Sequence, residues 1–144
     1  MANLPTRDDL IGQHAALRAL LADATREARR LRAEEDGAER SFALAIVALR
    51  KGLAAHNDAE EALLTPLLAT QDRAGVLRAQ RMLEEHGAEH ALFVRLLDRT
   101  LLVVAAKMDA LAEDLEAHMQ AEERTFLSPV VFATKRDTSA DSAK

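Results

Sequence analysis

The 144 residues suit one domain that is long enough to bury a core, and they carry a formal net charge of −5 with the histidines neutral. This acidic balance gives no support to nucleic-acid binding. The chain has no cysteine, which excludes disulfides, thiolate metal sites and thiol redox chemistry. Ala, Leu, Arg and Glu dominate, with only five Gly and three Pro, so we expect an all-α protein.

Neither a signal peptide nor a membrane span is expected. The first residues lack a basic region followed by an apolar run, and the longest apolar stretch, 101–106, is too short for a bilayer. We therefore expect a cytoplasmic protein that binds neither membrane nor nucleic acid. The basic cluster within 26–32 is followed at once by the acidic run 34–36, and we interpret it as a solvated helix end.

Apolar residues at helical spacing predict four amphipathic helices. The first runs over about 8–34, and Thr6 and Asp8 are its candidate N-caps. Its break is predicted at Asp36 and Gly37. Its apolar stripe consists of Leu10, Leu17, Leu21, Ala24, Ala28 and Leu31.

The second helix is predicted over about 39–69. Pro66 falls in its last turns and predicts a kink or an early stop there. The next break is expected at 71–75. The stripe of this helix consists of Phe42, Ile46, Leu49, Leu53, Leu63 and Leu67.

The third helix is predicted to begin near Gly75 and the fourth to end near Phe132. No Gly, Pro or Asn marks the turn between them, which we place at 100–107 from geometry alone. Short links between helices imply antiparallel neighbours, so we expect an up-down-up-down four-helix bundle. The predicted domain covers 1–133, and 134–144 is a polar tail that we expect to be disordered.

All five histidines belong to one pattern: a lone His, His-x-x-x-Glu, His-x-x-x-His and His-x-x-x-Glu, one on each predicted helix. Residues four apart lie one turn apart on the same side of a helix, so each pair presents two ligands together. The segments 53–61 and 115–123 share the phrase Leu-x-Ala-His-x-x-Ala-Glu-Glu, which indicates an internal repeat. The candidate metal ligands are His14, His56, Glu60, His86, His90, His118 and Glu122.

The predicted breaks bring these ligands to one level. Two ligands on antiparallel helices lie at one level when the turn is halfway between them in the sequence. The midpoint between His14 and His56 falls at the first break, and that between Glu60 and His86 falls at the second. The midpoint between His90 and His118 is the reason for placing the third turn at 100–107. The ligands also lie on the apolar stripes, where buried polar groups are costly unless something satisfies them. Five imidazoles and two carboxylates suit two ions, iron or manganese, with zinc as a further candidate.

This series of motifs resembles the hemerythrin and hemerythrin-like (HHE cation-binding) family over essentially the whole chain. The resemblance implies two non-haem iron ions joined by an oxo or hydroxo bridge. It assigns His86, His90 and His118 to one iron, His14 and His56 to the other, and Glu60 and Glu122 as bridging carboxylates. Leu115 matches a leucine that packs over the oxygen pocket.

The resemblance further implies a protein that binds dioxygen, or nitric oxide or peroxide, at an open position on one iron. Oxygen-carrying hemerythrins place an Asp five residues after the last His, where this chain has Glu123. The four-residue spacing of Glu122 is typical of the wider hemerythrin-like group. Turnover of hydrogen peroxide or nitric oxide, an iron-handling module and a sensor remain alternatives, and the redox partner is unknown.

Two rival motifs fit less well. Ferritin-like di-iron bundles need a Glu three residues before each His, and none is present. The segment 86–90 matches an inverted zinc-protease pattern, which leaves three histidines without a role. Gln13, Glu85 and Glu89 could be outer partners that hydrogen-bond to the imidazoles, but we interpret them as exposed and leave them outside the predicted site.

Overall fold

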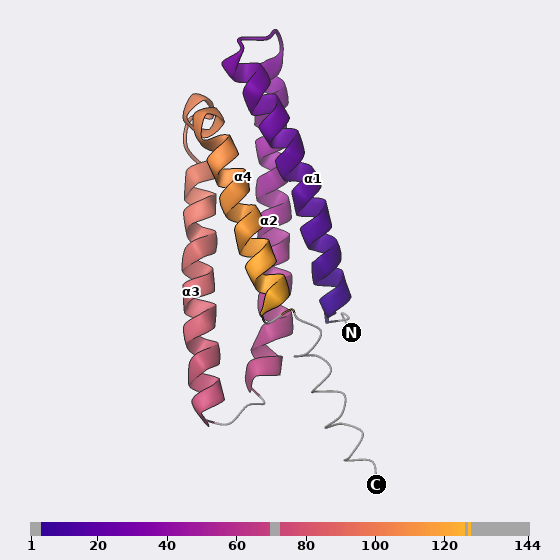
Figure 1. Cartoon of the computed structure of the whole chain (residues 1–144), viewed down its shortest axis with the longest axis vertical. Helices are drawn as coiled ribbons and strands as arrows, with labels where there is room; N and C mark the ends of the chain where they lie inside the picture. Colours follow the sequence, from indigo (N-terminus) through magenta and orange to yellow (C-terminus); the bar gives the residue numbers. More distant parts are fainter. Residues whose placement is uncertain (1–3, 70–72, 126, 128–144) are drawn as a thin grey trace. The chain divides into compact units, whose positions relative to one another are not determined.

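The computed structural model describes residues 4–69, 73–125 and 127, and over these residues the chain is all-α, as predicted (Figure 1). Its helices are α1 (Arg7–Arg32), α2 (Ala38–Ala69), α3 (Arg73–Leu97) and α4 (Leu101–Arg124). Across this part of the chain, no helix combines the length and apolar character that a membrane span requires. The up-down-up-down order of all four helices stays a prediction.

Packing divides the chain into two units, 1–112 and 113–144, with the boundary inside α4. In the first unit, α2 runs back along α1 and α3 runs back along α2 (Figure 1). The first half of α4 belongs to the same unit, where Asp109 accepts hydrogen bonds from Arg29 at 3.2 Å and Arg32 at 3.3 Å. These contacts fasten the end of α1 to the start of α4.

Buried residues on α1 and α2 follow the predicted apolar stripes at intervals of three or four residues, which places them on one face of each helix. His14 lies within the first stripe, and His56 and Glu60 lie within the second. Polar side chains therefore take positions that the helical period assigns to the core. The predicted stripe residues that are buried are Leu10, Leu17, Leu21, Ala24 and Ala28 on α1, and Phe42, Ile46, Leu49 and Leu53 on α2. Leu31 and Leu63 are only half-buried, and Leu64, which was not predicted, is buried in place of Leu63. The side chain of Leu67 lies outside the described part of the structure.

Gly52 lets α1 and α2 come close together beside the two histidines. A Cβ atom at Gly52 would lie 2.8 Å from Leu20 Cδ1 and 3.4 Å from Leu17 Cδ2. His56 follows one turn later on α2. The missing side chain at this position therefore favours a close approach of His14 and His56.

The link between α1 and α2 lies where Asp36 and Gly37 predict it. Gly37 has φ of 75°, a left-handed conformation that glycine adopts without steric cost. The preceding basic cluster is paired with carboxylates, as Arg30 contacts Glu27 at 2.8 Å and Glu35 at 2.7 Å. The hydrogen bond to Glu35 is the main cause that raises the pKa of the Arg30 guanidinium.

The predicted limits of the second helix are confirmed, since α2 spans Ala38–Ala69 and Pro66 does not stop it early. Two other predicted boundaries, the turn before α4 and the end of α4, are wrong. Residues 101–107 are helical, and the turn between α3 and α4 covers only 98–100. The midpoint argument failed because it assumed that His90 and His118 lie equally far from the turn. It also took no account of Thr100 as a residue type that favours the start of a helix.

The fourth helix ends at Arg124, before the predicted end near Phe132. After it, Thr125 Oγ1 donates a hydrogen bond to the Ala121 carbonyl at 2.7 Å. The predicted tail 134–144 lies outside the described residues. The domain limits 1–133 therefore stay a prediction.

The N-cap of α1 is Thr6, one of the two predicted candidates, and we expect Thr6→Ala to lower the free energy of unfolding by about 1 kcal/mol. Thr6 Oγ1 accepts a hydrogen bond from the Asp9 backbone N–H at 3.1 Å, and the Asp9 carboxylate accepts one from the Thr6 N–H at 2.7 Å. Urea unfolding measures the loss. Thr25→Ala, within the same helix, is the control, and an equal effect of both variants would contradict the role of the cap.

The acid dependence of this cap resides in Asp9. Its hydrogen bonds with the backbone and side chain of Thr6 hold the pKa of the Asp9 carboxyl below its ordinary value. The stabilisation is therefore present above the unfolded-state pKa and is lost as the pH falls through the folded-state pKa. We expect the destabilisation caused by Asp9→Ala to shrink in acid, as urea unfolding over a pH series would show.

Candidate metal centre

Two of the predicted ligands lie on α2, four residues apart. Their helical spacing brings His56 Nε2 to 3.3 Å from Glu60 Oε2. Both side chains are buried, with 2% of the His56 side chain and none of the Glu60 side chain exposed. This part of α2 therefore presents an imidazole nitrogen and a carboxylate oxygen together inside the first unit.

The helices on either side of α2 add histidines to this pair. From α1, His14 Nε2 lies 3.2 Å from His56 Nε2. From α3, His86 Nε2 lies 2.7 Å from Glu60 Oε2. A continuous series of potential ligand atoms thus runs from α1 through α2 to α3.

His90 extends the series along α3. Its ring centroid lies 3.9 Å from that of His86, and the two residues offer ring nitrogens within 4.8 Å of each other. Both residues are 6% exposed. The first unit therefore brings together five of the predicted ligands, His14, His56, Glu60, His86 and His90.

The other two predicted ligands form their own pair in the second unit. His118 Nε2 lies 2.5 Å from Glu122 Oε1 on α4, so the repeated motif has the same His-to-Glu contact on both helices. Leu115, one turn earlier, is buried. A single centre made of both groups stays a prediction, as does the pocket role of Leu115.

The chemistry of the first unit fits a bound cation. Glu60 Oε1 is buried and has no hydrogen-bond partner, and such an atom is costly in a protein interior. A neutral imidazole has one nitrogen with a free lone pair, and the Nε2 atoms of His14 and His56, either of which can be that nitrogen, lie 3.2 Å apart. A metal ion would satisfy the carboxylate oxygen and these nitrogens together.

Gln13 contacts the site, which favours its alternative interpretation as a partner of an imidazole over its interpretation as an exposed residue. Its Oε1 lies 3.0 Å from Nδ1 of His56, on the ring edge away from Glu60. The only signal for this contact in the sequence is a polar residue directly before His14. The other two residues left outside the site are exposed: Glu85 pairs with Arg81 at 3.3 Å, and Glu89 lies on the surface of α3.

The structure also weakens the inverted zinc-protease interpretation of 86–90. That pattern needs Glu89 beside the two histidines as the base. Glu89 is exposed, whereas the buried carboxylate that contacts His86 is Glu60 from another helix. The buried carboxylate next to the histidines of α3 is therefore a predicted ligand from α2.

Comparison with known proteins agrees with the pattern of ligands. The family model for the hemerythrin HHE cation-binding domain matches residues 6–130. Neither the curated proteins nor the solved structures compared with the chain give a significant match. The match spans all four helices and every predicted metal ligand. The chain belongs to the hemerythrin HHE cation-binding domain family.

Proposed function

We propose that this protein is a non-haem di-iron protein that binds dioxygen, or a related small molecule such as nitric oxide or peroxide. The observation that carries the proposal is the position of Glu60. Its Oε2 lies close to His56 Nε2 and His86 Nε2, which come from different helices, while its Oε1 is buried without a partner. A carboxylate between two groups of imidazoles is suited to bridge two ions.

The division of ligands follows the family resemblance. His14 and His56 would hold one ion, and His86, His90 and His118 the other, with Glu60 and Glu122 shared. Two histidines leave more room on the first ion than three leave on the second, so the small molecule would bind on the side of His14 and His56. The bound irons would exchange electrons reversibly with the bound small molecule.

The donor set fits iron, manganese and zinc, and the family resemblance is the reason for proposing iron. Imidazole and carboxylate suit all three metals, and the cysteine-free chain offers no thiolate. The many imidazoles leave few positions free for a substrate, which suits binding better than oxidation of an organic molecule. The chain also has no Tyr or Trp that could hold a stable radical.

Apolar side chains around the ligands would exclude water. Leu53 is buried one turn before His56, and Leu10 and Leu17 are buried on either side of His14. A dry surrounding strengthens the electrostatic attraction between the ligands and a cation. It would also slow the oxidation of the centre after the small molecule has bound.

Metal analysis and an optical spectrum of the iron-loaded protein test the proposal. We expect two irons per chain and, after the reduced protein meets air, a coloured species that disappears under vacuum. Immediate, permanent oxidation with catalytic consumption of peroxide would instead support an enzyme that turns over peroxide or nitric oxide. One ion per chain, or none, would contradict a di-iron centre.

A further inference from the structure

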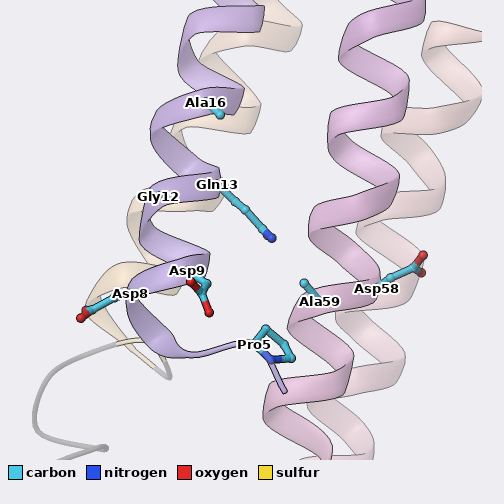
Figure 2. Close-up of a pocket in the computed structure, with 8 residues that line it drawn as sticks. All are labelled: Pro5, Asp8, Asp9, Gly12, Gln13, Ala16, Asp58 and Ala59. Carbon is cyan, nitrogen blue, oxygen red and sulfur yellow. The ribbon is translucent and has the colours of Figure 1, made fainter. Parts of the chain in front are cut away.

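Gln13 connects the buried histidine cluster with a hollow on the surface of the first unit. The hollow has a volume of about 790 Å³ and is lined by residues of the α1 start and of α2, among them Asp9, Gln13 and Asp58. Figure 2 shows the Gln13 side chain extending from α1 toward α2. The far end of this side chain meets His56, a residue with only 2% of its side chain exposed.

The contact favours a hydrogen on the Nδ1 atom of His56. Gln13 Oε1 lies 3.0 Å from His56 Nδ1, and because an amide oxygen only accepts hydrogen bonds, Nδ1 is the donor. A neutral imidazole has one N–H, so Nε2 then carries a lone pair. That nitrogen faces His14 Nε2 at 3.2 Å and Glu60 Oε2 at 3.3 Å.

The geometry points to Gln13 as a positioning residue, which holds His56 in the Nδ1–H tautomer and so presents Nε2 to a metal ion. The metal part of this inference rests on the proposed function, whereas the tautomer belongs to the metal-free protein. Hydrogen bonds from outer groups orient a metal-binding imidazole and raise its basicity. A glutamine does this without adding a charge to the edge of the hollow.

The position of Gln13 at the edge of the hollow explains why a long side chain with a hydrogen-bond acceptor is needed there. The hollow is open to solvent, so a shorter residue would let water compete for Nδ1, and an apolar residue would leave Nδ1 without an acceptor. In the second case the hydrogen can move to Nε2, where the Glu60 carboxylate lies within reach. His56 would then have its N–H on the side where the metal binds.

Two variants separate these effects. Gln13→Leu keeps the approximate size of the side chain and removes the acceptor, whereas Gln13→Glu keeps the acceptor. The control is Gln120→Leu on α4, because Gln120 is exposed and its side chain donates to Glu116 at 3.0 Å. Thermal unfolding followed by circular dichroism shows whether each variant is folded.

The first measurement uses metal-free protein at about pH 8, where an ordinary imidazole is neutral. Long-range ¹H–¹⁵N spectra distinguish the two tautomers, and the His56 ring is assigned by its loss in His56→Gln. We expect the Nδ1–H tautomer in wild type, Gln13→Glu and Gln120→Leu, and a shift toward Nε2–H in Gln13→Leu. The Nε2–H tautomer in wild type, or no change in Gln13→Leu, would overturn the inference.

The second measurement is competition for Fe²⁺ against a chelator without oxygen. We expect Gln13→Leu to bind iron about 10- to 100-fold more weakly than wild type. Gln13→Glu should restore most of the affinity. Equal affinities for Gln13→Leu and Gln120→Leu would overturn the positioning role. If wild type itself bound no iron, the proposed function would fail, and the spectra of the metal-free protein would still decide the tautomer.

Discussion

Glu60→Leu is expected to lower the iron content from two ions per chain to one or none while the protein stays folded. Glu60 Oε2 contacts both His56 Nε2 and His86 Nε2. Its loss removes the only predicted carboxylate ligand in the first unit. Iron analysis after loading without oxygen, followed by gel filtration, measures the effect.

The same variant should not harm the metal-free protein. A buried carboxylate with an oxygen that lacks a partner opposes folding, and an apolar side chain of similar size removes that cost. We therefore expect metal-free Glu60→Leu to be at least as stable in urea as metal-free wild type. Together, lost iron and kept stability would show that Glu60 serves the metal rather than the core.

The neighbouring Glu61 provides a matched control. Glu61 is exposed on α2, directly after the buried Glu60. Glu61→Leu is expected to retain both irons because its side chain points away from the cluster. If Glu61→Leu lost as much iron as Glu60→Leu, or if Glu60→Leu kept two irons, Glu60 would not be a ligand.

Removal of the metal is expected to lower the melting temperature at neutral pH. A ligand present at 100 times its Kd stabilises the folded state by about 2.7 kcal/mol. For a chain of this size, each kcal/mol corresponds to roughly 2–4 °C, so the metal-loaded protein should melt roughly 5–10 °C higher. Thermal unfolding with and without a chelator measures the difference.

Acid should abolish this difference, because protons compete with the metal for the ring nitrogens of the histidines. Metal release and the loss of the added stability are expected over the same pH range. After ultrafiltration, the metal released into the filtrate and the melting temperature of the retained protein can be measured on the same samples. Equal melting of both forms at neutral pH, with the same response to acid, would show that metal binding and folding are not coupled.

The internal repeat gives an independent view of the ligand set. His56 and Glu60 on α2, and His118 and Glu122 on α4, each form the contact that a four-residue spacing predicts. The two pairs arise from segments with the same sequence pattern. Local helical geometry therefore accounts for both contacts without reference to the rest of the fold.

The sequence by itself determined the features that depend on one helix at a time. The apolar period predicted most of the buried stripes of α1 and α2, Thr6 was among the candidate N-caps, and Gly37 marked the link between α1 and α2. The same period placed His14, His56 and Glu60 toward the core. These predictions succeeded because neighbouring residues on a helix have directions that the backbone repeat sets.

Only the tertiary structure decided the contacts between helices. The meeting of Gln13 with His56 and of Glu60 with His86, and the turn at 98–100, depend on how far each helix is rotated and shifted along its axis. Neither quantity is encoded in the spacing of apolar residues. The rotation and the shift of each helix follow from the packing of side chains, such as those around Gly52. These side chains come into contact only when the chain folds.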